Sequence, residues 1–233
     1  MQLFYCPEII DDIVVLPIEE AHHIFHVLRS KSGENIQLTN GKGSLYTAKI
    51  LEISKKTVTA EIIDEIKFQP RKNTLHIAIA PTKNIDRLEW FIEKATEIGI
   101  EQITPLRCQR SERKEVKQER LEKVIISAAK QSGKAYFPNM NPIISFEKFI
   151  ILNFNETKLI AHCDEGEKKS LKEIFTHAAD ALILIGPEGD FVPKEIELAI
   201  ANGFSSLSLG LSRLRTETAA LHVCSSFAIF NGE

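Results

Sequence analysis

The sequence predicts an α/β fold in two parts, a small β-rich unit followed by a domain built on a parallel sheet. Two observations predict it. Residues 1–66 contain short, closely spaced runs of strand-forming residues separated by glycine turns, a pattern typical of small barrels. Residues 181–230 repeat the order strand, glycine turn, helix, and their first strand is a continuous apolar run, typical of a sheet covered on both faces.

One predicted helix, at residues 18–30, interrupts the strands of the N-terminal unit, and Asn40-Gly41 is a good hairpin signal. His22 and His26 lie four residues apart and could share a metal on a helix face, but no third ligand is nearby, so we expect no metal. The predicted strands lie at residues 3–5, 13–16, 36–39, 45–53 and 57–66.

A polar, proline-bearing connector at residues 68–73 separates the two parts, so we expect domains at residues 1–68 and 73–233. Beyond the connector, apolar runs alternate with amphipathic segments, as in βαβ units. We expect strands at residues 75–80, 103–106 and 159–163, helices at 84–98, 118–132 and 146–152, a loop at 138–142 and a helical turn at 171–175.

Composition bounds the class of protein. The chain has 233 residues, 43% of them hydrophobic and 26% charged, which is typical of a globular protein. No apolar run approaches the roughly 18 residues of a membrane span, and the N-terminus does not resemble a signal peptide. The cysteines are scattered, which argues against zinc and disulfides and fits a reducing cytoplasm; they are Cys6, Cys108, Cys163 and Cys224.

The net charge of −3 does not indicate a nucleic-acid binder, so any polyanion would have to meet a local basic surface. Residues 107–123 hold seven basic residues against four glutamates. Such a mixed run is usually a solvated helix face, but Arg107, Arg110 and Arg113 precede its balanced part. These three arginines are the best local footprint for a polyanion.

The predicted glycine turns of residues 181–230 follow parallel strands, where open α/β sheets bind ligands. Gly186, Gly189 and Gly210 leave room for a flat ligand gripped by backbone groups, although glycines can also serve only to form turns. Arg215 and Glu217 stand with two threonines at the start of an apolar helix. So many polar groups are costly there unless they cap the helix or meet a partner.

Three blocks of this stretch resemble the C-terminal signature of the ribosomal RNA small subunit methyltransferase E family, which belongs to the SPOUT class of knotted methyltransferases. The blocks are Ile185-Gly186-Pro187-Glu188-Gly189, Leu209-Gly210 and Leu214-Arg215-Thr216-Glu217-Thr218-Ala219. The resemblance covers nearly all of the chain. It implies S-adenosylmethionine as methyl donor, held by Ile185–Gly189, Leu209, Gly210 and Leu214, and methylation of N3 of one uridine in 16S rRNA of the small ribosomal subunit.

The resemblance extends to other segments and implies contacts to RNA. The family has an N-terminal PUA-like barrel, and an H-x-x-x-V-L-R pattern matches His23 and Arg29 there. Lys83, the Arg110-Ser111 pair and Lys134 match further family positions, with lysine in place of arginine at position 134. Arg29 and Lys83 could equally be ordinary solvated side chains that contact no RNA. The family fold also implies a C-terminal trefoil knot and a homodimer packed on the last helix, although a buried core helix would have the same composition.

The chemistry requires that N3 of uracil lose its proton, because protonated N3 is a poor nucleophile. We expect Arg215 to stabilise the developing anion. Glu217 or Glu188 could take the proton, and the sequence does not rank them. Two other functions stay open: a SPOUT methyltransferase acting on another site, such as a tRNA ribose 2′-hydroxyl, or a non-catalytic RNA-binding assembly factor. A dinucleotide-dependent oxidoreductase is disfavoured because no G-x-G-x-x-G follows a strand.

Three positions depart from the family pattern. Asp190 stands where the family usually has a second glycine, and Val192 where a serine often caps the next helix, which leaves Glu195 without its capping-box partner. Ser212 stands where the family often has arginine, with Arg213 one place later. These departures leave the serine cap of the next helix and the role of the family's arginine in doubt. The rest of the cofactor pattern is intact.

Overall fold

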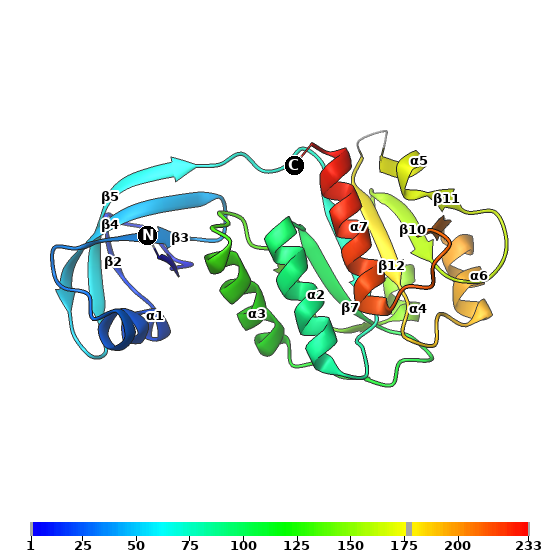
Figure 1. Ribbon diagram of the computed structural model, residues 1–233, viewed down its shortest axis with the longest axis horizontal. Helices are drawn as coiled ribbons and strands as arrows, with labels where there is room; N and C mark the ends of the chain where they lie inside the picture. The colour runs from blue at the N-terminus through cyan, green and yellow to red at the C-terminus, as the bar shows by residue number, and fades with distance from the viewer. Residues whose placement is uncertain (1, 176–178, 233) are drawn as a thin grey trace. The chain divides into compact units, whose positions relative to one another are not determined.

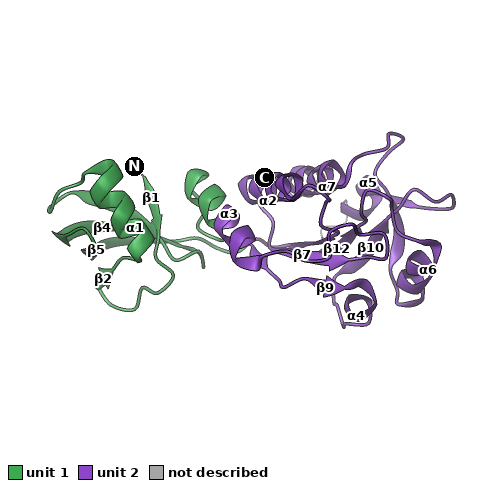
Figure 2. Ribbon diagram, turned by 90° about the horizontal axis from the view of Figure 1, so that it is seen from below, with its two compact units in different colours: residues 1–70, 126–137 green, residues 71–125, 138–233 purple. Residues whose placement is uncertain are grey.

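The computed structural model describes residues 2–175 and 179–232. By contact, the chain divides into two compact units, residues 1–70 with 126–137 and residues 71–125 with 138–233 (Figure 2). No helix in the described ranges is long and apolar enough to cross a membrane.

The first unit is built on a sheet in the order β1-β3-β4-β5-β2, in which β1 pairs with β3 in parallel and the other pairs are antiparallel. In β4, Tyr46, Ala48 and Ile50 are buried while Lys49 and Leu51 are exposed, the alternation expected of a strand with one covered face. The strands are β1 (Leu3–Tyr5), β2 (Ile13–Val15), β3 (Asn35–Thr39), β4 (Ser44–Ile53) and β5 (Val58–Lys67). All five predicted strands of this unit are confirmed within a residue or two.

The predicted helix at residues 18–30 is confirmed only at its start. α1 spans Ile18–His22, and the chain then widens into a π-helix, His23–Leu28, which ends at Arg29 with a left-handed φ of 54°. Ile24 is buried, but Val27 and Leu28 are exposed. The wider turn rotates these last apolar residues off the buried face, whereas a continuous α-helix would be expected to bury them.

Residues 126–137 return to the first unit through specific contacts. Nζ of Lys130 donates to both carboxylate oxygens of buried Glu20, at 2.6 and 2.8 Å. The hydroxyl of Tyr136 donates to the carbonyl of Phe68 at 3.0 Å. A buried carboxylate needs such a partner, so Lys130 offsets the cost of burying Glu20. No local signal in the sequence indicates that this segment belongs with residues 1–70.

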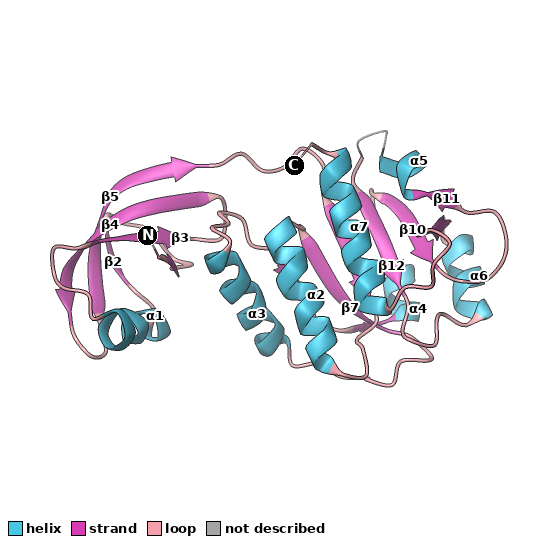
Figure 3. Cartoon of the chain, in the orientation of Figure 1, coloured by secondary structure: helices cyan, strands magenta, loops and turns pink. Residues whose placement is uncertain are grey.

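The second unit is built on a sheet in the order β11-β13-β10-β12-β6-β7-β8, with β9 also pairing with β7, and every one of these pairs is parallel (Figures 1 and 3). Its strands are β6 (Leu75–Ile79), β7 (Gln102–Arg107), β8 (Asn139–Met140), β9 (Ile144–Ser145), β10 (Thr157–Ala161), β11 (Lys169–Ser170), β12 (Ala181–Ile185) and β13 (Ser205–Ser208). Its helices are α2 (Ile85–Ile98), α4 (Phe146–Ile150), α5 (Leu171–Phe175), α6 (Pro193–Ala201) and α7 (Thr216–Phe230), while α3 (Gln118–Gln131) is divided between the units.

Helices cover both faces of this sheet. Figure 2 shows α2 and α7 on one side of it and α4 and α6 on the other. Every residue of the central strands β6 and β12 is accordingly buried. Continuous apolar runs such as residues 181–185 are therefore the correct signature of a doubly covered parallel sheet here.

Two local predictions meet different outcomes. The helix predicted at residues 84–98 is confirmed, with Asn84 as its N-cap accepting the N–H of Asp86 at 3.1 Å and Gly99 ending it at φ 116°. The loop predicted at residues 138–142 is wrong in part, because β8 lies inside it. The N–H groups of Asn139 and Asn141 donate to carbonyls of Glu101 and Ile103. The flanking prolines, which suggested a loop, are tolerated in so short a strand.

Candidate functional site

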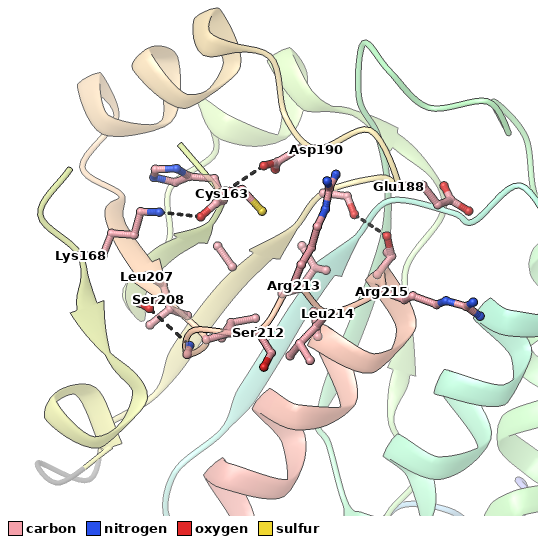
Figure 4. Close-up of a pocket in the computed structure, with 18 of the residues that line it drawn as sticks. Cys163, Lys168, Glu188, Asp190, Leu207, Ser208, Ser212, Arg213, Leu214 and Arg215 are labelled. Carbon is pink, nitrogen blue, oxygen red and sulfur yellow. Dashed lines mark hydrogen bonds between the residues drawn. The ribbon is translucent and has the colours of Figure 1, made fainter. Parts of the chain in front are cut away.

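Loops that follow β10, β12 and β13 enclose a cavity of about 650 Å³ (Figure 4). The three strands are neighbours in the sheet, so their carboxyl ends meet at one edge, where such sheets bind ligands. The sequence-predicted residues among its lining are Ile185, Gly186, Pro187, Glu188, Leu209, Gly210, Leu214 and Arg215. The structure thus gathers most of the predicted cofactor residues around one space of a size typical of a ligand site.

Gly189, the remaining predicted cofactor residue, lies outside that lining, and its carbonyl accepts a hydrogen bond from Nη1 of Arg110 at 2.7 Å. Gly186 is closely packed: a β-carbon there would lie 3.1 Å from the ring of Phe191 and 3.2 Å from its nitrogen. The buried hydroxyl of Thr216 donates to the Gly186 carbonyl at 3.0 Å. The loop after β12 is therefore fixed to the first turn of α7.

Asp190 occupies a position that explains the family's glycine. Its φ is 64°, in the left-handed region that glycine adopts freely and aspartate tolerates better than most residues. Oδ2 accepts the N–H of Cys163 at 2.8 Å, and Oδ1 accepts the N–H of Phe191 at 2.8 Å. The carboxylate thus joins the loop after β12 to the end of β10 across the cavity wall.

As expected, the side chain of Val192 makes no capping bond, yet Glu195 itself still caps the helix. Oε2 of the buried Glu195 carboxylate accepts the backbone N–H of Val192 at 3.0 Å. This bond is one of the two in a capping box, and it requires only the backbone of the N-cap residue. Oε1 accepts the N–H of Gln109 at 2.8 Å. Glu195 therefore caps α6 and also holds the segment that follows β7.

The polar side of the cavity was not predicted from the sequence. His162, Cys163, Lys168, Asp190 and Arg213 all line it. Burial, and then the charge of Lys168, lower the pKa of His162, whose Nε2 lies 2.9 Å from Oγ of Ser206. Partial burial, followed by the Asp190 carboxylate, raises the pKa of Cys163, so its thiol stays protonated and is a poor nucleophile.

The three candidate catalytic residues differ in setting. Arg215 and Glu188 are exposed, line the cavity and extend to the same side of it, away from Cys163 and Lys168 (Figure 4). Glu188 is oriented by the Lys83 N–H, which donates to its Oε1 at 3.0 Å.

Glu217 is buried instead, with Oε1 3.9 Å from Nε of Arg87. Its Oε2 has no hydrogen-bond partner among the residues that the structure describes. Glu217 also lies outside the cavity lining.

The predicted RNA contacts fall into two groups. In the second unit, Arg107 is exposed at the end of β7, and Lys83 pairs with Glu112 at 2.8 Å, which raises the pKa of its ammonium group first through that hydrogen bond. Arg110 and Arg113 instead donate to backbone carbonyls of site loops. In the first unit, Arg29 is exposed, His23 is half-buried against Phe4, and Lys134 donates its N–H to Ala129.

No group of three or more His, Cys, Asp or Glu side chains is placed to hold a metal ion within residues 2–175 and 179–232. The rings of His22 and His26 stack at a centroid distance of 4.3 Å.

Comparison with known proteins agrees with this geometry. Residues 69–228 match the RNA methyltransferase domain family, and residues 16–63 match the RNA methyltransferase PUA domain family. The ribosomal RNA small subunit methyltransferase E of Rickettsia conorii is 34% identical over 203 residues, covering 86% of this chain and 82% of the relative. The chain belongs to the ribosomal RNA small subunit methyltransferase E family.

Two solved structures are similar to this chain over nearly their whole length. A Porphyromonas gingivalis protein described as a probable rRNA-methyltransferase is 40% identical, with a TM-score of 0.91 over 100% of this chain and 99% of that one. A ribosomal RNA small subunit methyltransferase E from Neisseria gonorrhoeae, bound to S-adenosyl methionine, is 30% identical, with a TM-score of 0.85 over 97% of this chain and 95% of that one. The predicted PUA-like unit and SPOUT-type α/β domain are confirmed; the trefoil knot stays a prediction.

Proposed function

We propose that this protein transfers the methyl group of S-adenosylmethionine to N3 of one uridine in 16S rRNA of the small ribosomal subunit. One observation carries the proposal most directly. The family's signature loops close around a single cavity, in a fold that the Neisseria gonorrhoeae relative, bound to S-adenosyl methionine, shares with a TM-score of 0.85. The choice of uridine N3 rests on the family resemblance.

The cavity fits the cofactor. It offers apolar side chains for a flat base, from Ile185, Leu209 and Leu214, beside glycine-rich backbone at Gly186 and Gly210. His162, Lys168 and Arg213 also line the cavity and would provide polar contacts to the cofactor. When bound, S-adenosylmethionine supplies a methyl group on a positively charged sulfur.

Among the chain's own residues, we assign Arg215 to stabilise the negative imide that forms as N3 loses its proton, because its guanidinium group is exposed at the cavity. We assign Glu188 to accept that proton. It lines the cavity and is held by a backbone N–H, whereas Glu217 is buried beside Arg87 outside the lining. Glu217, at the start of α7, would instead orient the side chain of Arg87.

RNA would be held by basic residues of both units and not by overall charge, since the chain carries a net charge of −3. Arg29 and His23 on the PUA-like unit, Lys134, and Arg107 and Lys83 beside the site are the proposed contacts. We also propose that the protein acts as a homodimer, in the cytoplasm and without a metal.

The test is transfer of label from S-adenosylmethionine to small ribosomal subunits that lack the modification, with transfer RNA as the rival substrate. We expect incorporation into small-subunit rRNA and about 100-fold slower transfer by Arg215→Ala, the loss typical of removing one electrostatic group. Glu188→Gln should slow transfer by about 100-fold, the contribution typical of a general base, and more than Glu217→Gln does. Labelled transfer RNA, or no labelled RNA, would contradict the proposal. Transfer unchanged in Arg215→Ala would remove its catalytic role.

A further inference from the structure

The segment Cys108–Arg113, which we call the brace, links the end of β7 to two loops of the site. It is closed on itself: the hydroxyl of buried Ser111 accepts the Cys108 N–H at 3.0 Å, and the Ser111 N–H donates to the Cys108 carbonyl at 3.1 Å. Its Gln109 N–H is held by buried Glu195 at 2.8 Å. The brace therefore offers a fixed base from which its arginine side chains extend.

Arg110 reaches the cofactor loop, residues 186–190. Its Nη1 donates to the carbonyls of Gly189 at 2.7 Å and Phe191 at 3.4 Å. Its aliphatic stem covers Gly189, since a β-carbon added there would lie 3.4 Å from Cδ of Arg110. Hydrogen bonds from a charged donor are stronger than neutral ones, so this contact holds the loop whose residues line the cavity.

Arg113 reaches the loop after β6. Nε donates to the carbonyl of buried Thr82 at 3.1 Å, and Nη2 donates to the carbonyl of Lys83 at 2.8 Å. The N–H of the same Lys83 donates to Oε1 of Glu188 at 3.0 Å. Arg113 thus fixes the peptide that orients the proposed proton acceptor, and it is not itself one of the residues that line the cavity.

We propose that Arg110 and Arg113 are positioning residues with separate tasks. Arg110 shapes the cofactor loop for S-adenosylmethionine, and Arg113 sets the orientation of Glu188. This inference rests on the proposed function, and it replaces the expectation that both arginines bind RNA phosphates. Their charges are already directed at backbone carbonyls of the protein.

The first test measures S-adenosylmethionine binding to the full-length protein by calorimetry, and transfer kinetics. We expect Arg110→Lys and Arg110→Ala to raise Kd and KM for the cofactor about tenfold, the effect of losing one charge-assisted hydrogen bond, with a smaller change in kcat. Arg113→Lys should leave Kd within about twofold and lower kcat about tenfold. Lys114→Ala, at the exposed position that follows the brace, is the control for lost charge and should leave cofactor Kd unchanged.

The second test separates positioning from RNA contact. A phosphate contact contributes about one unit to the slope of log K against log salt concentration for RNA binding. We expect Arg110→Ala to keep the wild-type slope. A slope reduced by about one, with unchanged cofactor Kd, would overturn the inference in favour of RNA contact. If the wild type bound cofactor and Arg110→Lys and Arg110→Ala bound it equally well, this inference alone would fail. A wild type that bound no cofactor would overturn the proposed function, and this inference with it.

Discussion

The hydrogen bond from Thr216 to Gly186 allows a quantitative test of how the site is held together. Thr216→Val keeps the shape of the side chain but removes the donor, leaving the carbonyl of buried Gly186 without this partner. A buried group that loses its partner costs about 1–3 kcal/mol, and we take about 2 kcal/mol here. For a protein of this size that lowers Tm by about 4–8 °C. Because Gly186 lines the cavity, the affinity for S-adenosylmethionine should fall as well.

Thr218→Val is the matched control, because Thr218 lies on the same turn of α7 but is exposed. The same substitution there should change stability by no more than about 0.5 kcal/mol. Urea unfolding of both variants, followed by intrinsic fluorescence, gives the difference, and calorimetry gives the cofactor affinity. Equal stabilities for the two variants would refute the idea that this bond fixes the loop after β12 to α7.

Three further substitutions probe the fold and the site by urea unfolding. Burial lowers the pKa of His76 from 6.5 to about 4, so the unfolded state takes up the proton first as the pH falls. The free energy of unfolding should therefore fall by about 1.4 kcal/mol per pH unit between pH 6.5 and 4. His76→Gln should flatten this pH profile, and an unchanged profile would contradict the role of His76. Asp190→Ala should be less stable than Asp190→Gly by about 1 kcal/mol, since only glycine adopts a φ of 64° without strain; the reverse order would contradict this reading. Glu195→Gln places an amide donor against an N–H donor and should cost about 2 kcal/mol, whereas a wild-type midpoint would show that the two bonds to this carboxylate contribute little.

Regular elements were predictable because their physical causes are local. The alternation in β4 and the apolar run of β12 report which faces are covered, and both strands lie where the pattern predicted. The π-helix at residues 23–28 was not predictable, because apolar residues spaced for an α-helix look the same in sequence before the chain widens. The return of residues 126–137 to the first unit depends on pairs such as Lys130 with Glu20, which are 110 residues apart.

The site was half visible in the sequence. Gly186 and Gly210 were recognised because glycines mark turns; Gly186 packs closely against Phe191, and Gly210 has a φ of 108°, which favours glycine. The polar side, with His162 and Lys168, was missed because it comes from the connection between β10 and β11. Only the strand order places β10 between β12 and β13, and no local pattern reports that order.

In the brace, the sequence shows which residues are charged but not what their side chains bind. Charge is evident in the sequence, so Arg110 and Arg113 suggested a polyanion footprint, but their acceptors are backbone carbonyls that no sequence pattern identifies. Asp190 was recognised as a departure, and only its backbone angle and its bond to the Cys163 N–H explain how this chain does without the glycine.

The most direct test of the proposed function is to map the methylated position. Small ribosomal subunits lacking the modification are incubated with the protein and S-adenosylmethionine, and their 16S rRNA is copied by reverse transcriptase. A methyl on N3 blocks the pairing edge of uracil, so we expect one new strong stop, adjacent to a uridine. Incorporated methyl without any stop would indicate a ribose product and contradict N3 chemistry, and the absence of incorporation would contradict the methyltransferase function itself.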